Sequence, residues 1–420
     1  MSLGKGHRSP WSWIWAAFGL ALVIRTGVRD SGVITDHLEF GRRVLLGLDL
    51  YAPFLDGDKP LHAPYPPSFG ILTAPFALLP ERLARVLWGF VQVGGLWVVA
   101  LRLRDIARRY AAHLLPKLQY LYVFAAVLGA RYILRDTHGG GGNLINLALV
   151  LTAFQWAQRG WNVRSGLILG LSLATKPVAV LVLPLLWLLG HRRAPGIALF
   201  AAAGYLGISL ALLRQGMTPF LTWFDGTVRY VGMNDLFSEP PGGFPPFTWM
   251  NQCLRCCVAR YLGEVPPELA EEVPGFVSGL GLGATTAAWV SRGLSAMLMA
   301  ATFTLIWRAR RVRAAIPWSI AAILALSLLL SPISWKAHHV ALLPAFFLLG
   351  TKALMGCRGA WTVAGAYLVF CVLGEEVVGK EFKNIQQGYY FTTAGTLAIL
   401  GVCLWQVHHP QILPTVSKRR

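Results

Sequence analysis

The stretch GLILGLSLATKPVAVLVLPLLWLLG, residues 166–190, is apolar throughout except for one charge, Lys176, which is followed at once by Pro177. A membrane interior should expel a lysine from the middle of such a run. Proline lacks a backbone N–H and fits the first turn of a helix, so the sequence predicts two short helices that meet at Lys176. Each half, of about 12–14 residues, is too short for the ~30 Å hydrocarbon core. We therefore expect the junction to lie below the outer surface of the membrane, in a protein-lined cavity where irregular backbone is tolerated.

The composition of the chain is that of a membrane protein. Of its 420 residues, 55% are hydrophobic and 14% are charged, whereas soluble domains carry about 25% charged residues. The apolar residues form long blocks, and several blocks approach the ~20 residues of a spanning helix. The sequence therefore predicts an all-α polytopic membrane protein. The blocks cover residues 11–28, 83–103, 118–134, 143–158, 164–175, 177–190, 194–213, 285–307, 315–331, 337–351, 359–378 and 389–407.

Basic residues lie in short segments between these blocks, and an excess of Lys and Arg in short loops marks the cytoplasmic side. If the run is broken at Lys176, about twelve transmembrane helices result and every basic cluster lies on one side. Of the 19 carboxylates, only Asp105 then lies on that side, which is an independent check. A single crossing would instead place Arg308–Arg313 outside. The net charge of +19 therefore indicates topology rather than a nucleic-acid site.

The first apolar block follows a basic tail, as a signal peptide does, but no A-x-A-like cleavage site follows it. We therefore expect an uncleaved first helix and both termini in the cytoplasm. The whole chain, 1–420, is expected to form a single integral-membrane domain, with a main module at about 11–284 and C-terminal helices at about 285–407.

Two long segments, about 29–82 and 214–284, face outward in this topology. The first contains TDHLEFGRRVLLGLDLY, which predicts an amphipathic interfacial helix, and an apolar piece at 68–79 that is too short to span. The second is rich in Pro, Gly and aromatic residues and contains CLRCC, Cys253 to Cys257. This spacing matches no zinc site, and it predicts a thiol cluster in a loop or a disulfide.

Polar residues from several segments meet at the outer end of the predicted bundle. Cations that converge from different helices suit a phosphate, which glycine-rich backbone can approach closely, and a phosphate at this depth suggests a lipid-linked one. The plainer alternatives are a structural ion pair for Lys176, interfacial anchoring for the arginines, interfacial polarity for the histidines and a surface carboxylate for Asp36. The set comprises Asp36, Glu39, Arg42, Arg43, Arg131, Arg135, Asp136, His138, Lys176, Lys336, His338, His339 and the glycines 139–142.

The motifs, in their order along the chain, resemble those of one family. TDHLEFGRRVLLGLDLY followed by YPP resembles the first outer loop of polyprenyl-phosphate-sugar-dependent glycosyltransferases of the GT-C class, above all glycosyltransferase family 87, which includes mycobacterial α-1,2-mannosyltransferases and arabinofuranosyltransferases. The chain departs from the family where glycine replaces the usual Gln, where Cys253 replaces serine, and in the spacing of SWKAHH. The other matching motifs are D-x-x-x-G-(Q)-x-N (Asp136 to Asn143), G-x-x-x-G-x-x-x-A-x-K-P (Gly166 to Pro177), N-Q-S/C-L (Asn251 to Leu254) and S-P-I-S-W (Ser331 to Trp335).

The resemblance implies a GT-C fold in a bacterial-type plasma (inner) membrane. It also implies a hexosyltransferase of cell-envelope biosynthesis, which moves a sugar, expected to be mannose, from a polyprenyl-phosphate donor to a lipid or glycan hydroxyl on the outer face. Asp36 corresponds to the catalytic base, and one base without a nucleophilic carboxylate implies inversion at the anomeric carbon. No metal, cofactor or nucleic acid is expected. The donor-binding set is Lys176, Arg131, Arg135, Asp136, Asn143, Lys336, His338 and His339, and the acceptor- or loop-positioning set is Glu39, Tyr65, Asn251, Gln252 and Arg260.

The alternative is a transporter or flippase for a lipid-linked or anionic solute, with Lys176 at the binding site of a discontinuous helix. Transporters usually show paired repeats, and no second K-P-like break occurs in 285–407. Long outer loops with a carboxylate and paired histidines also suit catalysis better than the gating of a transporter. A GT-C transferase that acts on lipid A or on protein is a second alternative, which the motif set disfavours.

Overall fold

The fold is that of a computed structural model, which describes residues 10–28, 32–52, 65–213, 215–232, 236–237 and 247–410. Within these ranges the regular structure is helical, and a single β-bridge joins Gly263 to Leu282. The α-helices are α1 (Pro10–Gly27), α2 (Val33–Leu46), α3 (Pro67–Ala77), α4 (Glu81–Tyr110), α5 (Leu118–Gly139), α6 (Asn143–Gln158), α7 (Asn162–Thr175), α8 (Val182–Leu188), α9 (Arg193–Leu213), α10 (Thr218–Gly232), α11 (Leu254–Leu262), α12 (Pro267–Glu272), α13 (Ala284–Ala309), α14 (Ile316–Leu330), α15 (Leu343–Leu354), α16 (Arg358–Tyr367), α17 (Glu375–Val378), α18 (Lys380–Gly388) and α19 (Phe391–His408). The short 3₁₀ and π segments are η1 (Ala112–Lys117), η2 (Pro177–Ala179), η3 (Arg313–Ala315), η4 (Lys336–Leu342) and η5 (Leu368–Val372).

Six helical segments within the described residues are long and apolar enough to cross a membrane. Two shorter apolar segments, Pro177–Leu188 and Arg358–Val372, accompany them. The prediction of an all-α membrane protein is thus confirmed, while the count of about twelve crossings stays a prediction. The six segments are Glu81–Tyr110, Arg193–Leu213, Ala284–Ala309, Arg313–Leu330, Lys336–Leu354 and Phe391–His408.

The predicted break at Lys176 is confirmed. The helix α7 ends at Thr175, and Lys176 has a non-helical backbone with φ −154° and ψ 90°. Pro177 then opens the short η2, and α8 follows at Val182. The proline is responsible, because its ring disfavours helical backbone in the residue before it while its own φ suits the first turn of the next helix.

The G-x-x-x-G spacing of α7 serves close packing against α9. A Cβ atom at Gly166 would lie 2.6 Å from the Cβ of Ile197, and one at Gly170 would lie 2.7 Å from the Cβ of Ala201. Small residues allow two helix backbones to approach each other closely in a membrane. The motif therefore holds the helix that ends at Lys176 tightly against its neighbour.

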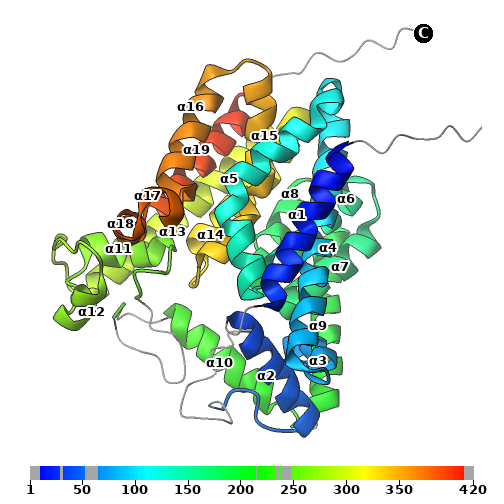
Figure 1. The fold of residues 1–420 in the computed structure, drawn as a ribbon, viewed down its shortest axis with the longest axis vertical. Coiled ribbons are helices and arrows are strands. Elements are labelled where there is room, and N and C mark those ends of the chain that lie inside the picture. Colours follow the sequence, from blue (N-terminus) through cyan, green and yellow to red (C-terminus); the bar gives the residue numbers. More distant parts are fainter. Residues whose placement is uncertain are drawn as a thin grey trace, which may run out of the picture.

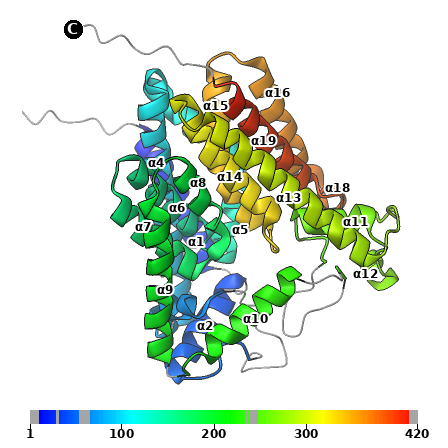
Figure 2. The same cartoon turned by 180° about the vertical axis from the view of Figure 1, so that it is seen from behind.

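The long helices form two groups that stand side by side in both views (Figures 1 and 2). The first group contains α1, α4 and α6 to α9, the second contains α13 to α16 and α19, and α5 lies between them. The start of α1 and the end of α19 lie at the same end of the molecule, as expected for two termini on one side. The short helices α2, α3, α10, α11, α12, α17 and α18 gather toward the opposite end.

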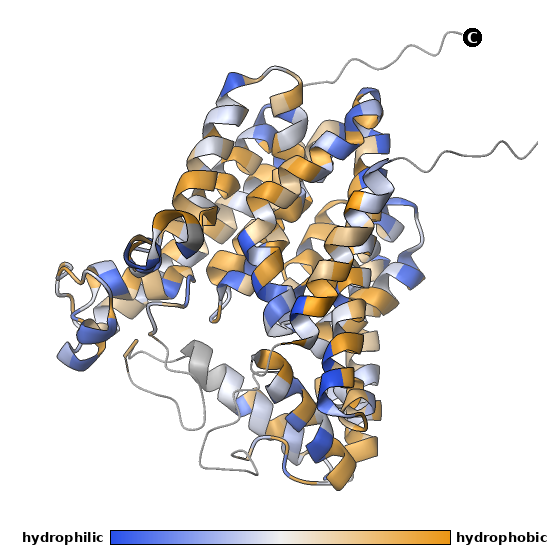
Figure 3. Cartoon of the chain, viewed as in Figure 1, coloured by the Kyte–Doolittle hydropathy of each residue, from blue (hydrophilic) through white to orange (hydrophobic). Residues whose placement is uncertain are grey.

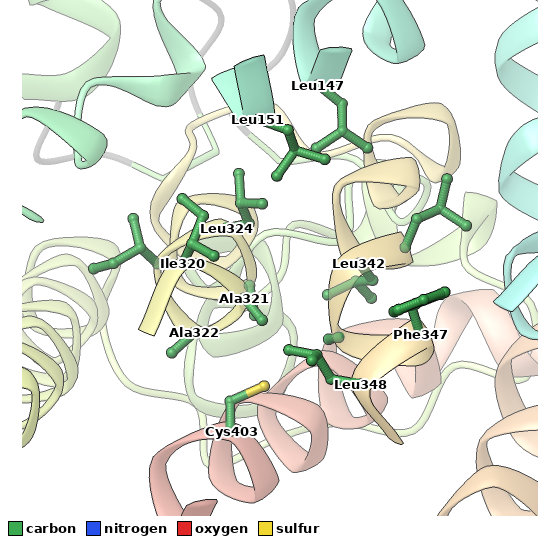
Figure 4. Packing of buried hydrophobic residues seen from close by; sticks show 14 of the residues in the cluster. Leu147, Leu151, Ile320, Ala321, Ala322, Leu324, Leu342, Phe347, Leu348 and Cys403 are labelled. Carbon is green, nitrogen blue, oxygen red and sulfur yellow. The ribbon is translucent and has the colours of Figure 1, made fainter. Parts of the chain in front are cut away.

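The two groups meet in an apolar core around α14, which runs between α6, α15 and α19. Figure 4 shows Leu147 and Leu151 of α6 above Ile320 and Leu324 of α14, with Cys403 of α19 below. All five side chains are buried. Hydrophobic residues line the bodies of the long helices, and hydrophilic residues gather toward the two ends (Figure 3). Such a surface matches a bilayer core with polar margins.

The two segments predicted to face outward contain more helix than the sequence indicates, since α10, α11 and α12 lie in the second. The predicted interfacial helix is α2, and the apolar piece at 68–79 is α3. The apolar block 359–378 was predicted as one helix, which is wrong beyond Val372, because Gly374 and Gly379 interrupt the backbone on either side of α17.

The CLRCC cysteines also differ from the expectation of a loop. Cys253 caps α11, and its Sγ accepts a 3.4 Å hydrogen bond from the backbone N–H of Cys256, which lies in the first turn. None of the three cysteines forms a disulfide. The stretch is therefore a helix start, and no disulfide joins its members.

Candidate active site

The glycine run after α5 sets the position of Asp36. Gly140 has φ +74°, and a Cβ atom there would lie 2.5 Å from the Cβ of Ile34 in the first turn of α2. Trp88 of α4 donates its indole N–H to the carbonyl of Gly140 at 2.9 Å. The end of α5 therefore lies directly on the start of α2, where Asp36 occupies the first turn.

Asp36 is half-buried, and burial raises the pKa of its carboxyl group from 3.8 to about 6. A carboxylate with a pKa just below neutral is ionised at pH 7 and still accepts a proton readily. The environment of Asp36 is thus suited to a general base.

His37 is a residue that the sequence analysis missed. It is buried, and neither ring nitrogen has a hydrogen-bond partner among the described residues. Tyr65, Phe69 and Trp88 surround its ring, with centroids 5.2, 4.7 and 5.6 Å away. Burial, and then the charge of Lys176, lower its pKa, so the ring is neutral. Only its place beside Asp36 in the sequence could have drawn attention to it.

Asp136 lies in the last turn of α5, and its carboxylate accepts hydrogen bonds from residues of the glycine motif. Its Oδ1 accepts from the side-chain amide of Asn143 at 2.7 Å, and its Oδ2 accepts from the backbone N–H of Leu144 at 2.9 Å. A Cβ atom at Gly141 would lie 2.4 Å from Oδ1, so only glycine fits there. The D-x-x-x-G-x-x-N motif is therefore the turn that joins α5 to α6, with Asp136 and Asn143 inside it.

Lys176 lies against this turn. Its Nζ donates to the carbonyl of Gly141 at 3.2 Å and sits 5.2 Å from the ring centroid of Tyr65. Burial raises the pKa of Tyr65 above its usual range, with further contributions from the charges of Asp136 and Asp36. These interactions bring together the helix break, the glycine motif and the first outer segment, as the sequence predicted. We call Asp36, Tyr65, Asp136 and Lys176 the Asp36 region.

The paired histidines follow the S-P-I-S-W turn and share contacts with Trp335. The backbone N–H of Trp335 donates to Nδ1 of His338 at 2.9 Å, which leaves the proton of a neutral ring on Nε2. The Nδ1 of His339 lies 3.1 Å from the carbonyl of Trp335, and its buried Nε2 has no partner among the described residues. His338 is the histidine nearer the Asp36 region, since the charge of Lys176 acts on it.

The N-Q motif holds the S-P-I-S-W turn in place. Asn251 donates to the carbonyl of Pro332 at 2.8 Å and accepts from the backbone N–H of Ser334 at 2.8 Å. Gln252 donates its backbone N–H to the carbonyl of Ser334 at 2.9 Å and its side-chain amide to the carbonyl of Gln387 at 3.0 Å. Two motifs that lie some 80 residues apart are thus one structural unit that orients η4.

Two further residues of the predicted positioning set brace outer segments. Glu39 is buried and accepts from Arg43 Nε at 2.9 Å, and Arg43 in turn donates to the carbonyls of Asp49 and Ala52 at 2.8 Å. Arg260 donates to the carbonyl of Val277 at 2.7 Å. Both lie in internal contacts that are suited to loop positioning.

Arg131, Arg135 and Lys336, which we call the Lys336 group, lie around another side of α5. The two arginines are one helical turn apart and share a face, whereas Asp136 points roughly 100° away. Arg131 donates to the carbonyl of Cys371 at 2.9 Å. The charges of both arginines act on Lys336. The structure therefore divides the predicted donor-binding residues between the Asp36 region and this group.

A half-buried carboxylate with a raised pKa lies in the same neighbourhood as a buried lysine, which is an arrangement suited to deprotonating a hydroxyl beside an anion. The profile of glycosyltransferase family 87 matches residues 63–332. The chain belongs to glycosyltransferase family 87. It is therefore a glycosyltransferase, as the resemblance implied. The matched range contains the glycine, K-P and N-Q motifs, while Asp36 and the paired histidines lie outside it.

Two curated proteins are similar to this family-87 enzyme over most of its length. It is 26% identical over 356 residues to the polyprenol-phosphate-mannose-dependent alpha-(1-2)-phosphatidylinositol pentamannoside mannosyltransferase of Mycolicibacterium smegmatis, with 82% of this chain and 77% of that protein covered. It is 27% identical over 364 residues to the protein of the same description from Mycobacterium tuberculosis, with 82% and 73% covered.

Proposed function

We propose that the enzyme transfers mannose from a polyprenyl-phosphate donor to a hydroxyl group of a lipid or glycan acceptor on the outer face of a bacterial-type plasma membrane. The relatives' dependence on polyprenol-phosphate-mannose supports the donor. The observation that carries the reaction is Asp36, a carboxylate with a pKa raised to about 6 at the start of α2, in the same neighbourhood as the buried Lys176.

In the proposed reaction, Asp36 accepts the proton of the acceptor hydroxyl as its oxygen attacks the anomeric carbon. The bond from that carbon to the phosphate oxygen breaks, and the electron pair leaves with polyprenyl phosphate. The configuration at the anomeric carbon inverts, because a single displacement without a covalent intermediate attacks from the opposite face. The departing phosphate gains negative charge, which cations near it stabilise.

We assign donor binding to the residues that the sequence predicted for it. Lys176 approaches the donor from the helix break, and the Lys336 group with His338 and His339 approaches it from α5 and η4. Asp136 and Asn143 shape the turn between these elements. Tyr65, Glu39, Asn251, Gln252 and Arg260 position the outer segments and the acceptor.

The test uses purified protein in detergent with radiolabelled polyprenyl-phosphate mannose and a membrane-lipid extract, with Asp36→Asn as the inactive control. We expect label to appear in a new lipid with the wild-type protein only. Donor binding without transfer by either protein would contradict mannosyl transfer to a lipid in that extract. Absence of any saturable donor binding would favour the transporter alternative.

A further inference from the structure

Two basic side chains of the Lys336 group, Arg135 and Lys336, have no ion-pair partner among the described residues. The charges that act on Lys336 are Arg131, Lys383, Arg135 and Glu375, in that order. Like charges held close together repel each other, so an arrangement of this kind favours an anion among them.

Lys383 of α18 is the cation of this set that the sequence analysis did not select. It forms an ion pair with Glu375, the described carboxylate that acts on Lys336. Both partners are partly exposed, with 30% and 47% of their side chains accessible. An exposed pair of this kind is weak, and the Lys383 ammonium can therefore exchange Glu375 for a stronger anion.

The docking of α18 places Lys383 on the same side as the Lys336 group. Gln386 accepts from Arg131 at 3.4 Å and donates to the carbonyl of Val369 at 3.1 Å. Lys383 lies three residues earlier, on the same face of the helix. The carbonyl of Gln387, the residue after Gln386, accepts a hydrogen bond from the side chain of Gln252. The backbone of Gln252 also holds the turn before Lys336. One set of contacts thus fixes α18 and η4 together.

We propose that Lys383 is a further donor-binding residue, which completes with the Lys336 group a subsite for the phosphate of the polyprenyl-phosphate donor. This inference rests on the proposed function. A mannosyl phosphodiester carries one negative charge, and the polyprenyl phosphate that leaves carries more. Four basic side chains from α5, η4 and α18 lie around that phosphate, whose negative charge favours the protonated form of Lys336, and they stabilise the charge that develops as the glycosidic bond breaks.

The test is equilibrium binding of polyprenyl phosphate to the full-length protein in detergent, with polyprenol as the competitor that lacks the phosphate. We expect Lys383→Ala to weaken binding about tenfold, since it removes one charge-assisted hydrogen bond. Lys383→Arg should bind within about twofold of the wild type. The matched control is Lys380→Ala, which removes an exposed lysine from the same helix and should also stay within about twofold.

Equal binding by Lys383→Ala and Lys380→Ala would overturn the assignment. Displacement of polyprenyl phosphate by polyprenol at equal concentration would also overturn it, because no phosphate subsite would then exist. Failure of the proposed function has a different signature. The wild-type protein would bind polyprenyl phosphate with the expected dependence on Lys383 and would transfer no mannose.

Discussion

The Asp36 region and the Lys336 group lie on different sides of α5, and they differ in the partners that surround their positive charges. In the Asp36 region the cation Lys176 is 6% exposed, contacts a backbone carbonyl and an aromatic ring, and has Asp136 as its charged neighbour. In the Lys336 group, positive charges face one another, and Glu375 is already paired with Lys383. In the first arrangement the cation already has partners inside the protein, although the proposed function also places it beside the donor. The second, where like charges repel one another, favours binding of an anion.

The largest loss of turnover is expected from a change to the proposed catalytic base, Asp36. Asp36→Asn keeps the size of the side chain but cannot accept the proton, so turnover should fall by about 10²–10⁴-fold while polyprenyl-phosphate binding stays normal. Transfer rates and binding measured on one preparation check this. The matched control is Asp49→Asn, a carboxylate in the turn after α2, which should keep its activity. Retained turnover in Asp36→Asn would move the base to another residue, such as Glu39.

The substitution Lys176→Ala tests whether the buried lysine contacts the donor or only stabilises the glycine turn through its hydrogen bond to Gly141. We expect a loss of donor affinity and turnover of about tenfold or more, because a buried cation next to a developing anion is removed. The exposed Lys117 at the start of α5 provides the control as Lys117→Ala. A folded Lys176→Ala protein with normal affinity and turnover would confine Lys176 to a structural role.

The dependence of the transfer rate on pH should follow the ionisation of the Asp36 carboxyl group. A base works only when it is ionised, so activity should fall as the pH drops through about 6 and should be about tenfold lower at pH 5 than at pH 8. Polyprenyl-phosphate binding by Asp36→Asn over the same range separates this step from titration of the phosphate. A wild-type profile that stays flat down to pH 5 would exclude Asp36 as the titrating base.

The smallest effect is expected from a single methyl group in the glycine turn. Gly141→Ala places a Cβ atom 2.4 Å from Oδ1 of Asp136, so the turn beside Lys176 must shift, at a cost of about 1–3 kcal/mol. We expect lower thermal stability and a several-fold loss of activity. Gly139→Ala is the matched control, since nothing lies within 4 Å of its added Cβ atom. Equal stability of the two variants would show that the turn is not closely packed around Asp136.

Much of the architecture could be predicted from the sequence, because hydrophobicity and proline act locally. Eleven of the twelve apolar blocks overlap helical segments along most of their length, although α4 continues to Tyr110 beyond its block, and the break falls at Lys176 as Pro177 requires. The exception is 359–378, where glycines divide a run that hydropathy alone joins. Local chemistry of this kind leaves its signal in neighbouring residues, so the sequence alone is enough to detect it.

The tertiary structure alone decided which distant residues meet. Asn251 contacts the turn at Ser334, Gly140 contacts Ile34, and α18 brings Lys383 to the side of α5 that carries Arg131. Hydropathy does not encode such pairings, because they depend on how helices pack and on which face each one turns inward. The sequence by itself therefore determined a helical membrane glycosyltransferase with a broken helix at Lys176. Packing decided that its basic residues lie in two groups rather than one, since adjacent positions on α5 and η4 point to different sides.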